Sequence, residues 1–201
     1  MVFLEENNPK RYPHGHFTAH IALYVSFGSY TGAYDDAVTV LYKEVAEGGE
    51  TPDRIVYPLL FLMRHALELG YKWTLLGLAS YLKKPCKTGE FRHSLSKLHI
   101  RLGDDVRELC QRLEVEIPDF NRRYVEAESV LKLFEQLDKE EFAFRYPTDR
   151  NRRKMSFAAG QTINLLDIKN DYDSAMVLLR HTLNVVGDHI DPDDEWHRKV
   201  W

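Results

Sequence analysis

A wide apolar stripe between Thr51 and Lys84 constrains the fold of this 201-residue chain more than any other feature. Apolar residues recur there at steps of three and four, which is the spacing of one helix face. They are Leu59, Leu60, Met63, Ala66, Leu67, Trp73, Leu75, Leu76 and Leu78. A helix with so wide a stripe needs neighbours on several sides. We therefore predict the central helix of a bundle.

Local signals mark the start of this helix. Thr51, Pro52 and Asp53 supply an N-cap residue, a proline at the first helical position and an acidic residue in the first turn. Pro58 has no backbone N–H, so it either kinks the helix or marks its true start. The stripe itself continues to about Lys84.

A second helical stripe precedes this one over residues 17–47 and includes Val40 among its apolar positions. Gly28 and Gly32 lie four residues apart on the same face. Two interpretations follow. Either the small residues let another helix backbone come close, or the segment breaks near Ser29 into two helices.

Two more helices are predicted in the middle of the chain. Residues 93–113 have a helical pattern, which Gly103 is expected to interrupt so that a second short helix restarts there. Residues 118–139 have a clearer pattern, with an apolar residue at every third or fourth position.

The pattern changes after residue 139. Apolar and polar residues alternate over 142–147, and 162–166 is a second short extended candidate, which predicts a small hairpin or an irregular excursion. A last helix is predicted at 167–190.

Together these segments predict a mostly all-α fold, an up-and-down bundle of about five helices with a small extended excursion near 142–166. Residues 17–190 are expected to form a single domain, because a chain of about 150–200 residues buries roughly 70% of its surface in one core. Residues 1–16 and 191–201 are expected to be N-terminal and C-terminal tails. The composition, 44% hydrophobic and 29% charged, is that of a globular protein.

Hydropathy and charge limit the expected cellular location of the protein and the partners that it can bind. Arg64, His65, Glu68 and Lys72 interrupt the richest apolar stretch, and about 18 to 20 uncharged residues are needed to cross a bilayer. The first sixteen residues hold no apolar segment of a secretory signal, so we expect a cytoplasmic protein with no membrane contact. A net charge of -4 argues against a wholly basic surface that coats nucleic acid, and leaves room for local basic patches.

Motifs for metals and cofactors are absent from the sequence. Cys86 and Cys110 are too few and too far from suitable partners for a disulfide framework or a cysteine zinc site. His181 and His189 have no zinc-binding spacing. The sequence has no glycine-rich phosphate loop, Gly-x-Ser-x-Gly elbow or His-Glu-x-x-His pair. We therefore expect no metal and no cofactor.

The first candidate site lies within the central helix. Arg64 and Glu68 are four residues apart and share one helix face. They could form an ordinary solvated ion pair, which contributes only about 0.5 kcal/mol. Alternatively, they form a polar constellation in a cleft or a subunit interface, where a planar guanidinium can bind phosphate.

The second candidate site lies at the start of the third helix. Arg92 and His99 are seven positions apart, nearly two helical turns, so both side chains project from one face about 10 Å apart. An arginine can stabilise charge on a phosphodiester, and a histidine can move the proton of an RNA 2′-hydroxyl. These two are the candidate catalytic residues. His93 either joins them in binding phosphate or packs locally at the helix start.

A basic cluster follows the fourth helix and forms the third candidate site. It consists of Arg145, Arg150, Arg152, Arg153 and Lys154. Aromatic residues alternate with these basic residues, a composition that suits phosphate contact and base stacking. A simple solvated loop is the other interpretation. The cluster gives the best sequence support for a nucleic-acid contact.

Four landmarks in order resemble HEPN-like proteins (higher eukaryote and prokaryote nucleotide-binding) of bacteria. They are Leu62-Met-Arg-His-Ala-Leu-Glu-Leu-Gly-Tyr-Lys, His93-Ser-Leu-Ser-Lys-Leu, Phe144-Arg-Tyr-Pro-Thr-Asp and Ile163-Asn-Leu. The resemblance covers roughly residues 50–190. It implies a helical bundle that commonly dimerises and a role in RNA cleavage or nucleotide binding, often in defence, toxin–antitoxin or stress systems.

The resemblance leaves two functions open. Active members of the family cut RNA without metal, using an Arg-x(4–6)-His motif from each subunit of a dimer. Arg92 and His99 fit that spacing but lie on an earlier helix than is usual in the family. We therefore expect a binding or regulatory module for RNA, a nucleotide or a protein partner, with a homodimeric metal-independent endoribonuclease as the alternative.

Overall fold

The computed structural model describes residue 19 and residues 26–86, 93–138, 143–148, 151 and 153–188. Within these ranges the chain forms five α-helices and no strand, which confirms the prediction of a mostly all-α bundle. The helices are α1 (Phe27–Ala46), α2 (Pro52–Tyr81), α3 (Leu95–Leu113), α4 (Phe120–Leu137) and α5 (Leu165–Asp188). None of these helices is long and apolar enough to span a bilayer.

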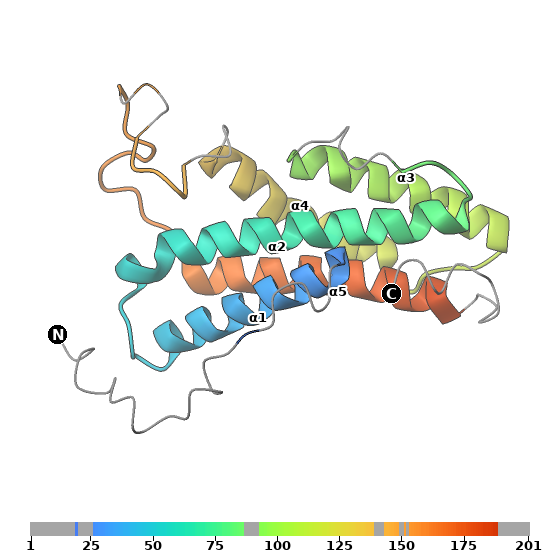
Figure 1. Cartoon of the computed structure of the whole chain (residues 1–201), viewed down its shortest axis with the longest axis horizontal. Helices are drawn as coiled ribbons and strands as arrows, with labels where there is room; N and C mark the ends of the chain where they lie inside the picture. The colour runs from blue at the N-terminus through green and yellow to red at the C-terminus, as the bar shows by residue number, and fades with distance from the viewer. Residues whose placement is uncertain are drawn as a thin grey trace.

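Helix α2 is the central helix, as its wide apolar stripe predicts. It packs against α1, α3 and α5 (Figure 1). Leu59, Met63, Leu67 and Leu78 are completely buried there. The helix begins at Pro52 with Thr51 as its N-cap residue and continues through Pro58, so Pro58 does not mark its start.

The helices alternate in direction except between α2 and α3. Side-chain contacts join Glu68 to His93 and Tyr71 to His99, so residue numbers rise together and the two helices run parallel. Arg112 at the end of α3 also reaches the Leu82 carbonyl just beyond α2. The first turn of α3 therefore lies beside the middle of α2, and the two helices run in the same direction (Figure 1).

Helix α1 covers α2 with a narrower buried face than the sequence predicts. Val38 is completely buried, whereas Val40, which the stripe assigned to the core, is 60% exposed, so that prediction is wrong. The reason is that α1 lies at the rim of the bundle. Ser26 and Ser29 form a capping box at its start, and a Cβ atom on Gly28 would lie 2.9 Å from the Trp73 ring. This contact is with a side-chain ring and not with a helix backbone, and a Cβ on Gly32 would meet no atom within 4 Å, so the predicted close approach of two backbones is not seen at these glycines.

Two predicted boundaries are corrected by side-chain contacts. Helix α3 is continuous through Gly103, where the lack of a Cβ lets the Tyr124 ring of α4 come close. Helix α5 begins at Leu165, inside the segment predicted to be extended, because the Asn164 side chain accepts a hydrogen bond from the Leu166 N–H.

The segment between α4 and α5 is the irregular excursion that the sequence predicts. An isolated antiparallel bridge joins Thr148 to Met155, and the Ser156 N–H donates to the Pro147 carbonyl at 2.9 Å. The segment extends beyond the end of the bundle at which α2 begins (Figure 1).

We expect Gly103→Ala to lower the free energy of unfolding by about 1–3 kcal/mol, because the new methyl group would overlap a ring that cannot move freely. A Cβ at this position would lie 2.9–3.0 Å from three atoms of Tyr124. Gly32→Ala is the matched control within a helix, since its Cβ would meet no atom within 4 Å. The control should gain about 0.5–1 kcal/mol. Urea denaturation of both variants measures the difference, and equal shifts would contradict the packing argument.

Candidate functional site

The candidate site begins with a carboxylate buried in the middle of α2. Glu68 is 3% exposed. It accepts hydrogen bonds from Lys72 Nζ at 2.5 Å and His93 Nδ1 at 2.8 Å, and Arg64 lies 3.7 Å away. Burial by itself would raise the pKa of Glu68, but the hydrogen bonds and charges of Lys72 and His93 outweigh it and hold that pKa below its ordinary value. Glu68 is therefore an ionised carboxylate at neutral pH.

Arg64 links this carboxylate to two other segments. Its NH2 group donates to the His93 carbonyl at 3.1 Å, and its Nε atom lies 3.7 Å from Asp138 at the end of α4. Asp138 is buried and accepts a hydrogen bond from the Ala143 N–H at 2.7 Å. We call Arg64, Glu68, Lys72, His93 and Asp138 the charge cluster. It joins α2, the start of α3 and the segment that follows α4.

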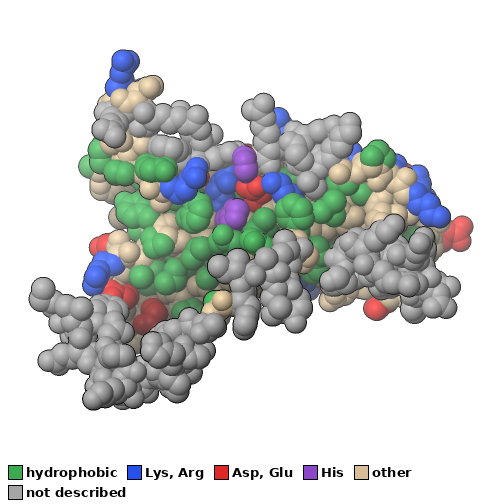
Figure 2. All heavy atoms as spheres, viewed as in Figure 1, with side chains coloured by type: hydrophobic (Ala, Val, Ile, Leu, Met, Phe, Trp, Pro, Cys, Tyr) green, Lys and Arg blue, Asp and Glu red, His purple; other side chains and the backbone are tan. Residues whose placement is uncertain are grey.

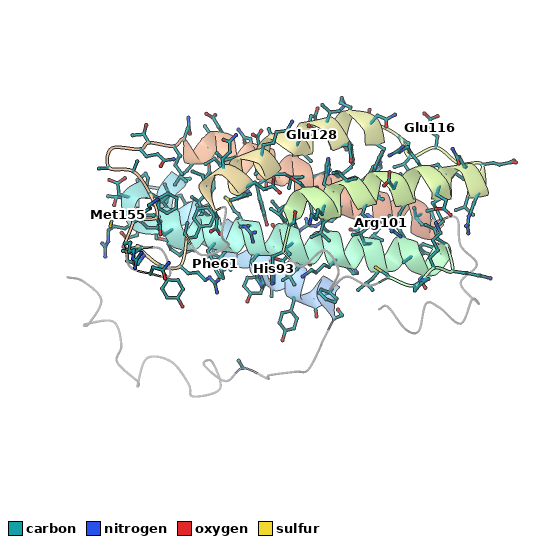
Figure 3. The ribbon with its side chains drawn as sticks, turned by 90° about the horizontal axis from the view of Figure 1, so that it is seen from above. Phe61, His93, Arg101, Glu116, Glu128 and Met155 are labelled. Atoms are coloured by element: carbon teal, nitrogen blue, oxygen red, sulfur yellow. The ribbon has the colours of Figure 1, made fainter. Side chains whose placement is uncertain are left out.

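His93 is the member of the charge cluster that meets solvent. Its side chain is 57% exposed, while those of Arg64 and Lys72 are only 12% exposed. The ring is oriented by one nitrogen, since Nδ1 contacts the buried carboxylate. A histidine held in this way can accept or donate a proton at the surface. Figure 3 labels His93 beside α2, near the start of α3.

A pocket of about 690 Å³ lies between the start of α2 and the segment after α4. Its aromatic lining residues are Tyr57, Phe144, Tyr146 and Phe157. The rings of Tyr57 and Phe157 have centroids 5.5 Å apart, and those of Phe144 and Phe157 are stacked at 5.8 Å. Tyr57 and Tyr146 are each 49% exposed, so the pocket opens to solvent.

Part of the predicted basic cluster lies at this pocket. Arg145 lines it and is positioned over the Tyr146 ring at 5.9 Å from the centroid. Arg153 and Lys154 are exposed on the same segment. Arg150 and Arg152 lie outside the described residues. We call the four aromatic residues and Arg145 the aromatic pocket.

One member of the predicted catalytic pair is buried, and the other lies outside the described residues. His99 is 4% exposed, its Nδ1 contacts the Tyr71 hydroxyl at 2.9 Å and its ring stacks on Tyr124. Its Nε2 atom is buried without a hydrogen-bond partner in the described part of the chain. Burial lowers the pKa of His99 to about 4, so the ring is neutral at pH 7. Arg92 lies outside the described residues.

The fold therefore brings Arg64, Glu68 and His93 together, whereas the ring of His99 is buried against Tyr71 and Tyr124. Lys72 and Asp138 belong to the same cluster but were not among the predicted site residues. Lys72 gave a signal, because it interrupts the apolar stripe one turn after Glu68. Asp138 gave none, since its contact with Arg64 joins residues far apart in sequence.

No group of three or more histidine, cysteine, aspartate or glutamate side chains in the described ranges is arranged to hold a metal ion. Comparisons with protein-family models, with curated proteins and with solved structures each find no match. The fold and site define an all-α bundle with a buried charge cluster beside an aromatic pocket. The function is therefore argued from those two features.

Proposed function

We propose that this chain is a HEPN-like binding module that takes single-stranded RNA at the aromatic pocket and works in the cytoplasm. The observation that carries the proposal is the pocket itself, in which exposed tyrosines lie beside Arg145. Its volume of about 690 Å³ is within the usual range for ligand sites, about 300–1,000 Å³. Aromatic faces stack on bases, and arginine adds both charge and stacking.

The exposed basic residues beside the pocket support the same ligand. Arg153 and Lys154 follow Arg145 on one segment, so they can contact the phosphates on either side of a bound base. Because the net charge of the chain is -4, its surface as a whole is not basic and the basic patch is local. A local patch favours a short contact with RNA over coating of a long nucleic acid. The family resemblance adds a homodimer and a role in a defence or toxin–antitoxin system to this proposal.

We expect Tyr146→Ala to weaken binding of a fluorescent single-stranded RNA by about 5- to 150-fold, because loss of one stacked base costs about 1–3 kcal/mol. Arg145→Ala should weaken binding and make it less sensitive to salt. Leu113→Ala and Arg107→Ala on α3 are matched controls, since both side chains are exposed away from the pocket. Fluorescence anisotropy at several salt concentrations measures these effects. If no RNA binds the wild-type protein, a free nucleotide or a protein partner becomes the better proposal.

The second candidate function is a metal-independent endoribonuclease, and the exposed ring of His93 on buried Glu68 favours it. In this mechanism His93 takes the proton of an RNA 2′-hydroxyl, and the 2′-oxygen attacks the adjacent phosphorus. The P–O5′ bond breaks, the 5′-oxygen takes a proton from solvent, His93 returns its proton to solvent, and a 2′,3′-cyclic phosphate remains. Arg64 and Lys72 lie beside this centre and offset the charge of Glu68. His93 takes the role that the sequence assigned to His99.

We expect His93→Ala to slow cleavage of total tRNA in EDTA by about 100-fold, the usual effect of losing a proton-transfer group. His99→Phe is the paired variant, because it retains a ring against Tyr124 and tests the pair predicted from sequence. Gel analysis of the cleaved RNA measures both rates, after circular dichroism shows that each variant is folded. Loss of cleavage in His99→Phe alone would return the assignment to His99. An inactive wild-type protein would leave the binding function.

A further inference from the structure

A row of aromatic side chains leads away from the aromatic pocket along α2. Tyr57, Phe61 and His65 are spaced four residues apart, which is about 6 Å along a helix axis. The rings of Phe61 and His65 are nearly parallel, with an interplanar angle of 6° and centroids 5.8 Å apart. Tyr34 of α1 meets the His65 ring edge-on at 4.5 Å. We call these four residues the aromatic row.

The aromatic row is accessible and continuous with the pocket. Tyr57 belongs to both, and Phe61, His65 and Tyr34 are half-buried. Figure 2 shows hydrophobic side chains gathered on this face beside histidine and basic side chains. Figure 3 places Met155 of the pocket, Phe61 and His93 in succession along α2. The row therefore connects the pocket to the charge cluster.

Basic groups lie at both ends of the row. Arg145 is at the pocket, and Arg64, Lys72 and His93 surround Glu68 at the other end. Burial lowers the pKa of His65, although Glu68 opposes this effect, so its ring stays largely neutral at pH 7. A neutral ring stacked on Phe61 offers a flat surface to a base. Glu68 and Asp138 compensate the charges of Arg64 and Lys72, so the cationic end of the row is Arg145 at the pocket, and the exposed ring of His93 lies at the other end. Stacking surfaces that begin beside a cation suit a polyanion that carries bases.

We propose that the aromatic row continues the RNA path, so that the ligand is a strand of several nucleotides and not a mononucleotide. One base enters the aromatic pocket, the next bases stack over Phe61 and His65, and the backbone reaches His93. Tyr57 and Glu68 are eleven positions apart, about 16 Å along α2, which is beyond the reach of one nucleotide. This inference rests on the proposed RNA-binding function and specifies its ligand.

The test compares an RNA octanucleotide with a single ribonucleotide in the full-length protein. Phe61→Leu is the decisive variant, because it keeps an apolar side chain against the core and removes the flat ring. We expect it to weaken octanucleotide binding about fivefold and to leave binding of the single ribonucleotide unchanged. Tyr146→Ala in the pocket should weaken both ligands. Leu113→Ala should change neither.

Each other outcome has a distinct meaning. If Tyr146→Ala weakens the octanucleotide but Phe61→Leu does not, RNA uses the pocket and leaves it by another route, which overturns the inference alone. If the wild-type protein binds neither of the two ligands, both the inference and the proposed function fail. If Phe61→Leu converts a wild-type dimer into a monomer in light-scattering measurements, the row is an interface between two copies of the chain, and the inference is overturned.

Discussion

Glu68→Gln is expected to lower the free energy of unfolding by about 3–5 kcal/mol, because it leaves buried positive charge without its carboxylate. Glu68 is 3% exposed, and the side chains of its partners Arg64 and Lys72 are 12% exposed. Asp138 would remain near Arg64 and offset part of these charges. Urea denaturation followed by circular dichroism measures the loss.

Glu126→Gln is the matched control for this substitution. Glu126 pairs with Arg122 on α4 at 2.8 Å, but their side chains are 41% and 54% exposed. An exposed pair contributes about 0–1 kcal/mol, so the control should change stability little. If the two variants lose the same free energy, the charge cluster is solvated and the burial argument fails. Both variants replace a glutamate by glutamine, so the difference between their free energies of unfolding reports the effect of burial on the ion pair.

Acidification from pH 7 to pH 5 is expected to remove about 2 kcal/mol of stability through His99 alone. The pKa of His99 is lowered from 6.5 to about 4 in the folded protein, chiefly by burial. Below pH 6.5 the unfolded chain binds a proton that the folded chain binds only near pH 4, so stability falls as the pH falls. The full loss is about 3 kcal/mol, since one pKa unit corresponds to about 1.4 kcal/mol.

The double variant His99→Phe with Tyr71→Phe isolates this effect. It removes the hydrogen bond between the two side chains together with both of its partners, so no buried polar group is left unpaired there. Between pH 7 and pH 5, its free energy of unfolding should fall by about 2 kcal/mol less than that of the wild type. Urea denaturation at both pH values gives this difference. An unchanged pH dependence would mean that His99 already binds a proton in the folded state near pH 6.

The helices could be predicted from sequence where burial is strongest. Residues of α2 and α4 face neighbours on wide surfaces, so their apolar spacing is regular, as at Val130, Leu131 and Phe134. The prediction failed at Gly103, where a glycine usually interrupts a helix but here admits the ring of Tyr124. That contact joins two helices, and spacing along one helix does not reveal it. The parallel course of α2 and α3 escaped prediction for the same reason.

The candidate site was predictable only where it lies on one helix. Arg64 and Glu68 are four residues apart, so their pairing follows from helix geometry. The contact between Glu68 and His93 depends on the parallel packing of α3 on α2, which no local pattern specifies. The spacing of Arg92 and His99 also favoured His99 as a catalytic residue. Helix periodicity alone does not show whether that face of the helix is buried or exposed. Tyr57 and Phe157 meet across the fold and gave no combined signal.

The contact of Asp138 with both Arg64 and the Ala143 backbone has a consequence for ligand affinity. One carboxylate fixes the charge cluster to the first residues of the segment that builds the aromatic pocket. A substitution at Arg64 thus changes how firmly the pocket wall is held, even for a ligand that never touches the guanidinium. Side chains that are remote from the bound base then influence which ligand binds, because they set the free energy needed to hold the pocket wall in its binding position.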